Sequence, residues 1–134
     1  MDDIFVARLM STDLITVTPD TLVEEGAQTM LEHGIGSLLV VDEDGRLEGI
    51  LTNTDFVQIV AERKPKDQTP VSAYMTTDIV TASAQDSVRD VADAIVEHGF
   101  HHMPVVDEDE GVIGIITTTD LAAYLSDVQR PSPA

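Results

Sequence analysis

The stretch GILTNTD, residues Gly49–Asp55, returns 65 positions later as GIITTTD, residues Gly114–Asp120. The same offset places Glu32-His33-Gly34 on Glu97-His98-Gly99. Between residues 6–60 and 71–125, about 20 of roughly 55 aligned positions are identical without a gap. So many identities at one offset indicate an internal duplication, and the chain contains two copies of one unit.

Both copies show the same order of expected elements. A short β-prone run precedes a segment with apolar residues at helical spacing; two strand-like runs joined by an acidic turn with glycine follow, and a second helix ends the unit. The predicted ranges are 14–18, 21–33, 37–41, 47–51 and 53–63 in the first copy and 79–82, 86–98, 103–106, 112–116 and 118–125 in the second.

The first helix of each copy carries recognisable end signals. Gly34 and Gly99 are expected to end these helices as left-handed caps. Thr21 or Asp20 is expected at the start of the first one, and its counterpart begins at Gln85 or Asp86.

The predicted fold class is α/β (α+β), with two β-α-β-β-α repeats over residues 6–63 and 71–126. The polar segment 64–70, which contains two prolines, is expected to be a linker, and residues 127–134 a flexible tail. Because neither segment can hold a core, we expect the repeats to pack sheet to sheet around a pseudo-twofold axis.

The charge of the chain argues against polyanionic partners. Its 134 residues include 25 acids and 7 bases, which gives a net charge of −18. Such a surface repels phosphates, so we expect neither nucleic acid nor membrane as a partner. It resembles the surfaces of proteins from salt-loving organisms, which suggests a haloarchaeal source. The N-terminus lacks the features of a signal peptide and no apolar run is long enough to span a membrane, so we expect a cytoplasmic protein.

The repeated T-x-x-D sequence stands where a strand runs into a helix. Hydroxyls and a carboxylate lie there beside free backbone N–H groups and the positive end of the helix dipole, a corner that can hold a phosphate and a sugar diol. The same residues also suit plain helix capping without any ligand. The sequence leaves both interpretations open, because duplicated caps would look the same.

The duplicated unit, with its apolar runs at 34–42 and 101–107 and its G-h-h-T-x-x-D ending, resembles a tandem pair of CBS domains, also called a Bateman module. The resemblance covers about residues 6–125 and implies sheet-to-sheet pairing. It also implies a sensor that binds adenosine-containing ligands such as AMP, ADP, ATP or S-adenosylmethionine in clefts between the repeats. The ligand would be regulatory, and no other cofactor is required.

The resemblance assigns roles to residues of this chain. Asp55 and Asp120 would hold the ribose hydroxyls, with Thr52 and Thr117 beside ribose or phosphate. The other candidate site residues, apolar ones around the adenine among them, are Leu14, Ile15, Ile35, Gly36, Thr54, Ile79, Val80, Phe100, His101, His102 and Thr119.

The two copies differ at the start of their second strand, where Gly36-Ser37 aligns with His101-His102. In the family this position often presents basic groups to phosphates. The difference suggests one site for a charged phosphate and one for a less charged ligand, or for none.

A metal site, an enzyme and an interaction module are the alternatives to a ligand sensor. His98, His101 and His102 with Glu97 have the spacing of a metal site, but an imidazole before a glycine cap has a structural explanation, so no metal is expected. No nucleophile elbow, P-loop or H-E-x-x-H occurs, so no catalytic residue is assigned and no enzyme is expected.

The remaining alternative is a ligand-independent module that dimerises or docks on a transporter or enzyme. The expected contact surface is the second helix of each copy, with a homodimer and an unknown protein partner as the assemblies. Its apolar residues are Phe56, Val57, Ile59, Val60, Leu121, Ala122, Tyr124 and Leu125.

Overall fold

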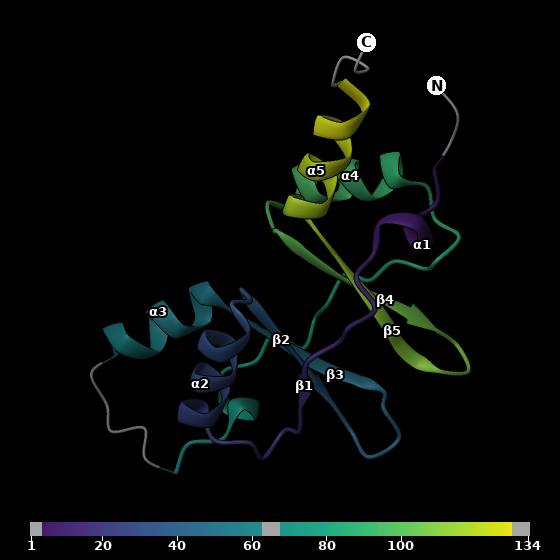
Figure 1. The fold of residues 1–134 in the computed structure, drawn as a ribbon. Coiled ribbons are helices and arrows are strands. Elements are labelled where there is room, and N and C mark those ends of the chain that lie inside the picture. Colours follow the sequence, from purple (N-terminus) through teal and green to yellow (C-terminus); the bar gives the residue numbers. More distant parts are fainter. Residues whose placement is uncertain (1–3, 63–67, 130–134) are drawn as a thin grey trace. The chain divides into compact units, whose positions relative to one another are not determined.

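The computed structural model describes residues 4–62 and 68–129 (Figure 1). These residues form two compact units, each with its own sheet and its own apolar core. Unit 2 is the continuous stretch Ile15–Ile79, and unit 1 combines the residues up to Leu14 with those from Val80 onward. Most of the expected linker, residues 64–67, lies outside the described residues.

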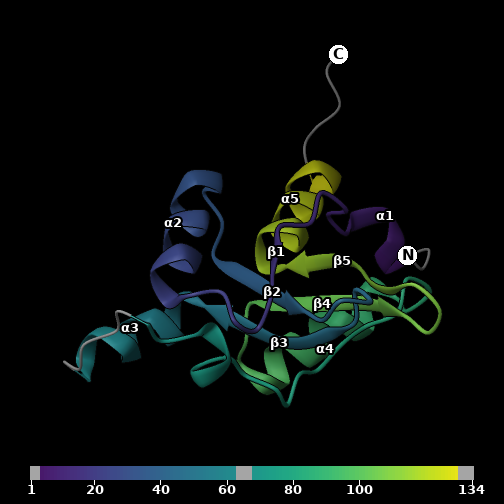
Figure 2. The same cartoon turned by 90° about the horizontal axis from the view of Figure 1, so that it is seen from below.

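Unit 2 is built on a three-stranded sheet in the order β1-β2-β3. Parallel pairing joins β1 (Thr16–Val17) to β2 (Ser37–Val41), and β2 pairs antiparallel with β3 (Leu47–Thr52). Figure 2 shows β2 and β3 side by side, with α3 continuing from the end of β3. The helical elements are α2 (Val23–His33), α3 (Asn53–Ala61) and the short 3-10 helix η1 (Val71–Ala73).

Unit 1 repeats this arrangement with a two-stranded sheet, in which β4 (His102–Asp107) pairs antiparallel with β5 (Gly111–Thr117). In place of a strand like β1, Ala82 forms a single parallel bridge to Val105 of β4. Its helices are α1 (Val6–Leu9), α4 (Val88–His98) and α5 (Thr118–Gln129). The helix α5 thus extends beyond residue 126, where the tail was expected to begin.

The hairpins and the glycine caps agree with the sequence predictions. Gly34 and Gly99 end α2 and α4 with φ of 63° and 74°. In the first hairpin, Oδ1 of Asp42 accepts hydrogen bonds from the backbone N–H groups of Asp44 and Arg46, each at 2.9 Å. Gly45 then takes the positive φ of 80° that the turn requires. The acidic turn is thus closed by its own first carboxylate.

The compact units differ from the sequence repeats, because each repeat gives its leading segment to the other unit. The N–H of Val6 donates to the carbonyl of Asp86 at 2.9 Å, and the N–H of Val88 donates to that of Ile4 at 2.7 Å. In unit 2 the corresponding bond runs from the N–H of Val23 to the carbonyl of Thr69 at 2.9 Å. Residues 68–70 of the expected linker are therefore part of the bonded structure.

The predicted starts of α2 and α4 were wrong. The N-cap positions are Leu22 and Ser87, one or two residues after the expected ones. The carbonyls of Thr69 and Ile4 satisfy free N–H groups at these helix starts, so the caps come partly from distant residues. At α4 a local signal was also present, because the hydroxyl of Ser87 accepts the N–H of Asp90 at 3.1 Å.

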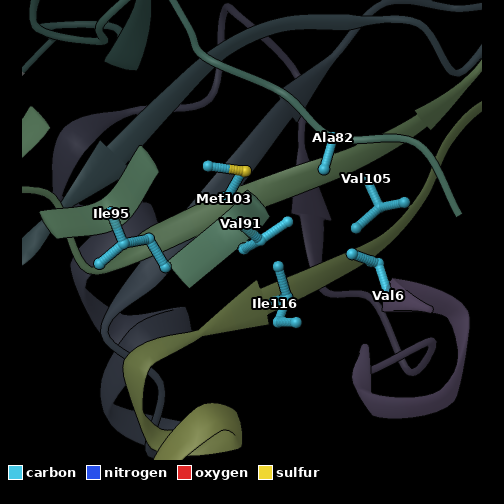
Figure 3. Packing of buried hydrophobic residues seen from close by; sticks show 7 residues of the cluster. All are labelled: Val6, Ala82, Val91, Ile95, Met103, Val105 and Ile116. Atoms are coloured by element: carbon cyan, nitrogen blue, oxygen red, sulfur yellow. The ribbon is translucent and has the colours of Figure 1, made fainter. Parts of the chain in front are cut away.

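Each exchanged segment inserts a valine into the receiving core. Val6 and Val71 are 0% exposed, and they occupy matching positions in the two copies. Figure 3 shows Val6 among the buried side chains of unit 1, which are Val6, Ala82, Val91, Ile95, Met103, Val105 and Ile116. The core of unit 2 contains Met30, Leu38, Val40, Leu51 and Val71.

The cores compensate for differences in side-chain size. Gly26 in α2 matches Val91 in α4, and a Cβ on Gly26 would lie 3.2 Å from Leu38, 3.4 Å from Val71 and 3.8 Å from Phe56. Phe56 in unit 2 matches Leu121 in unit 1. The larger ring of Phe56 fills the space beside Gly26 that Val91 fills in unit 1. Such volume exchange keeps both cores closely packed.

The second helices contribute less exposed apolar surface than the sequence suggested. Phe56 and Leu121 pack against their own cores, and Ile59 is buried. Among the side chains of α3 and α5 that the structure describes, the large apolar ones exposed are Val57, Val60 and Leu125.

We predict that Val6→Ala and Val71→Ala each lower the free energy of unfolding by about 2 kcal/mol, because each removes two methyl groups from a filled core. Urea denaturation at constant salt measures the change. Phe5→Ala is the control, since Phe5 is 56% exposed and should cost less than about 1 kcal/mol. Equal losses for Phe5 and Val6 would contradict the role given to the exchanged valine.

Candidate functional site

The repeated T-x-x-D sequence forms a helix cap in both units. In unit 1, Oδ2 of Asp120 accepts hydrogen bonds from the backbone N–H of Thr117 at 2.9 Å and from its hydroxyl at 3.1 Å. The hydroxyl oxygen of Thr117 in turn accepts the backbone N–H of Asp120 at 3.2 Å. In unit 2, Oδ2 of Asp55 accepts from the N–H of Thr52 at 2.8 Å and from its hydroxyl at 3.4 Å. The capping interpretation is therefore confirmed.

Capping leaves part of each carboxylate available. Both side-chain hydrogen bonds of Asp55 and both that the Asp120 carboxylate accepts use Oδ2. Among the described residues, Oδ1 of either aspartate has no hydrogen-bond partner, and both side chains are partly exposed. A carboxylate oxygen held by its neighbour in this way can accept hydrogen bonds from an incoming diol.

The start of the second strand closes one side of each corner. The N–H of Asn53 donates to the carbonyl of Gly36 at 3.2 Å, and that of Thr118 donates to the carbonyl of His101 at 3.0 Å. The strand register places Ser37 opposite Thr52 and His102 opposite Thr117. Strand start and helix start therefore meet at one place in each unit.

Sequence reasoning left Ser37 off the list of site residues. It is 8% exposed and stands where unit 1 has His102. The signal that could have found it was present in the 65-residue offset, which aligns Ser37 with His102.

His102 gives the unit 1 corner an ionisable side chain at the position where the unit 2 corner has Ser37. Burial lowers the pKa of this half-buried imidazole, and the neighbouring His101 lowers it further. Asp120 acts against both effects, which places its charge close enough to favour the imidazolium form. The unit 1 corner therefore combines a carboxylate with a histidine whose charge depends on its surroundings.

The structure sorts the predicted apolar residues between the units. Ile15 and Ile35 pack against the core of unit 2, and Phe100 packs against that of unit 1. Leu14 and Val80 belong to unit 1, whereas Ile79 belongs to unit 2. Each unit thus contains one predicted residue from the leading segment of the other repeat.

Thr54 and Thr119 are placed differently from the other predicted polar residues. Both are exposed in the first turn of their helices, and neither side chain has a hydrogen-bond partner among the described residues. Their place in the ligand site therefore stays a prediction.

The histidines of unit 1 do not form a metal centre. The ring of His98 stacks on Phe100, with 5.5 Å between centroids and 14° between planes. Within residues 4–62 and 68–129, no three His, Cys, Asp or Glu side chains lie close enough together to hold a metal ion. The stacking also covers one face of the Phe100 ring.

None of the helices in residues 4–62 and 68–129 has both the length and the apolar character that crossing a bilayer requires.

Comparison with known proteins gives consistent matches. The profile of the CBS domain matches residues 6–62 and again residues 71–127. The CBS domain-containing protein YhcV of Bacillus subtilis is 34% identical over 117 residues, which are 87% of this chain and 82% of that protein.

A solved structure extends the likeness to the fold. The CBS domain pair of protein MJ0100, in complex with 5′-methylthioadenosine and S-adenosyl-L-methionine, superposes with a TM-score of 0.86 at 27% identity. The match covers 96% of this chain and 100% of that chain. The predicted class, an α+β pair with two sheets and helices, is confirmed.

A longer relative carries the same unit beside other segments. The choline transport ATP-binding protein OpuBA of Bacillus subtilis is 33% identical over 122 residues, which are 91% of this chain and 31% of that protein.

The lowered pKa of His102 predicts a pH dependence of stability. Between that pKa and the ordinary value of about 6.5, the unfolded chain binds more protons than the folded one, so the free energy of unfolding falls as the pH falls through this window. His102→Ser, which introduces the residue of unit 2, should make the decline shallower. Urea denaturation between pH 5 and about 8 measures both slopes. Equal slopes would contradict the assignment.

Proposed function

Because this chain belongs to the CBS domain family, with one domain over residues 6–62 and a second over residues 71–127, we propose that it is a regulatory module that senses an adenosine-containing ligand. The ligand binds at the Thr117–Asp120 corner of unit 1, at the Thr52–Asp55 corner of unit 2, or at both. The proposal assigns no reaction to the chain.

The observation that carries the proposal is the available Oδ1 of each capping aspartate. Its partner oxygen is held by the threonine, so the carboxylate is fixed in place before a ligand arrives. A fixed acceptor beside a helix start suits the two hydroxyls of a ribose. The ligands of the MJ0100 pair, 5′-methylthioadenosine and S-adenosyl-L-methionine, both carry an adenosyl group, which supports this ligand class.

The same corners offer apolar contacts for a base. Ile15 and Ile35 in unit 2, and Phe100 in unit 1, are partly buried and lie at the edge of their cores. A purine ring could cover such side chains and remove apolar surface from water.

The two sites are proposed to differ in the charge they accept. His101 and His102 in unit 1 can meet a phosphate, whereas Gly36 and Ser37 in unit 2 carry no charge. A phosphate beside His102 raises its pKa again, so binding takes up a proton and strengthens as the pH falls. Unit 1 is therefore proposed to prefer a nucleotide, and unit 2 an uncharged or cationic adenosine compound.

A sensor passes its signal through a second protein or a second copy of this chain. A ligand can do so only if it binds two arrangements of that assembly with different affinity. The match to OpuBA, in which the unit forms 31% of a transport protein, supports a transporter or an enzyme as one class of partner.

A second candidate function is ligand-independent dimerisation. In a chain with a net charge of −18, α3 contains one charged residue, Asp55, and α5 contains two, Asp120 and Asp127. Asp55 and Asp120 are engaged in capping, so α3 with its exposed Val57 and Val60 carries no other charge. Two copies would meet there with the least repulsion.

We predict that calorimetric titration in molar KCl detects binding of AMP, ATP or S-adenosylmethionine. Asp120→Ala should weaken binding in unit 1, and Asp55→Ala binding in unit 2, by about 1–3 kcal/mol for the lost hydrogen bond to a diol. Each variant is the control for the other site.

The stability of both variants is measured alongside, because loss of the cap itself costs about 1 kcal/mol of folding free energy. Absence of heat with all three ligands, together with a dimeric mass by light scattering, would favour the ligand-independent alternative.

The acidic surface leads to a separate prediction. If the protein is adapted to high salt, as we propose from its charge, its melting temperature rises between low salt and molar KCl because salt screens the repulsion among its acids. Scanning calorimetry at both salt concentrations measures the difference. A melting temperature that does not rise would argue against a haloarchaeal source.

A further inference from the structure

The segment Ile4–Leu14, here called the arm, is joined to unit 1 at both ends. Near its start, Val6 and Ala7 donate their N–H groups to the carbonyls of Asp86 and Ala84 at 2.9 and 3.0 Å. Near its end, Ser11 and Ile115 exchange two backbone hydrogen bonds of 2.8 and 3.0 Å. Near its end the arm thus forms an isolated antiparallel bridge to β5.

The glycine of the repeated GIITTTD sequence makes this contact possible. A Cβ on Gly114 would lie 2.7 Å from Sδ and 3.1 Å from Cγ of Met10, and 3.1 Å from the carbonyl oxygen of Ser11. Any larger residue would push the arm away from β5. Gly49 stands in the same relation to the side chain of Met75 in unit 2.

The contact lies close to the proposed ligand corner. Ile115 precedes Thr117 by two residues on β5, and the Thr117–Asp120 cap begins where that strand ends. The arm itself ends at Leu14, which is one of the candidate ligand residues. Movement of the arm therefore changes both the strand that holds Thr117 and the position of Leu14.

We propose that the arm, through Met10 and Ser11, is a positioning element for the unit 1 site. Docking of the arm against Gly114 and Ile115 holds Thr117 where Asp120 can fix it. Release of the arm loosens this cap and weakens the site, while the corner of unit 2 is unaffected. The ligand part of this inference rests on the proposed function, but the effect on the cap does not.

The two units provide a matched comparison. In unit 2 the corresponding contact is the pair of hydrogen bonds between Ile50 and Thr76, of 3.0 and 2.9 Å, beside Gly49. That segment belongs to the continuous stretch 15–79, whereas the arm reaches unit 1 from the opposite end of the sequence. A contact that stabilises or displaces residues 4–14 would therefore affect the unit 1 site and not the unit 2 site.

The test measures amide hydrogen exchange by NMR in the full chain without ligand. Gly114→Ala should raise the exchange of the Ile115 and Thr117 amides at least tenfold and leave the Thr52 amide unchanged. Gly49→Ala should produce the mirror result, with faster exchange at the Ile50 and Thr52 amides and no change at the Thr117 amide. Faster exchange at Ile115 with full protection at Thr117 would overturn the proposal.

A second pair of variants removes these hydrogen bonds without a substitution in β5 or β3. Ser11→Pro removes the N–H that bonds to Ile115, and Met10 before it already has the extended conformation, φ −65° and ψ 149°, that a following proline requires. Thr76→Pro is its counterpart in unit 2. This pair decides the question if Gly114→Ala does not fold.

Compensating changes separate arm docking from general damage. Met10→Ala should restore protection only in part to Gly114→Ala, because the Ser11 carbonyl still lies 3.1 Å from the new methyl group. Met75→Ala should likewise rescue Gly49→Ala only in part, because the Cβ that alanine retains still lies 3.0 Å from the new methyl group. Absence of any rescue in both units would contradict the assigned contacts.

Titration with AMP then tests the link to the ligand. If the unmodified chain binds, Gly114→Ala should weaken the unit 1 site at least tenfold, and AMP should slow exchange of the Ser11 amide by linkage. Unchanged affinity in a variant with a released arm would refute the coupling. If no adenosine ligand binds the unmodified chain, the proposed function fails, while the exchange data still decide whether the arm positions the cap.

Discussion

The reciprocal exchange of leading segments is the constraint on which the structure depends. Val6 and Val71 each fill a core built mainly from the other repeat. The carbonyl of Ile4 accepts the N–H of Val88 at the start of α4, and that of Thr69 accepts the N–H of Val23 at the start of α2. A valine with no exposed surface and a capped helix are each worth a few kcal/mol at most, but a domain has little stability to spare. Neither repeat, taken strictly as its sequence copy, contains a complete core.

The threonine–aspartate contact shows how one arrangement can serve both folding and binding. Capping needs one carboxylate oxygen, and both units use Oδ2 for it. The other oxygen is left fixed in position, so a ligand need not order it at further entropic cost. The units differ beside this shared feature, where strand register places Ser37 opposite one threonine and His102 opposite the other. Equal folds can therefore support unequal sites.

The sequence predicted what is local and missed what is distant. Acidic turns, glycine caps and the strands of both hairpins follow from neighbouring residues, and the structure confirms them. The start of α2 was misplaced because the carbonyl of Thr69 completes it from far away in the chain, whereas at α4 the local cap of Ser87 on Asp90 was overlooked. The exchange itself was invisible, since Val6 aligns with Val71 whether each packs on its own repeat or on the other. Contact of Met10 with Gly114 was hidden for the same reason, and the glycine was taken only as part of a ligand motif.

A crystal structure grown with saturating 5′-methylthioadenosine or AMP in high salt would show whether the capping aspartates receive the ribose of an adenosine ligand. We expect ribose hydroxyls within hydrogen-bond distance of Oδ1 of Asp120, Asp55 or both, with each Oδ2 still bound to its threonine. A ligand bound elsewhere, or a ribose that displaces the threonine from its aspartate, would contradict this expectation.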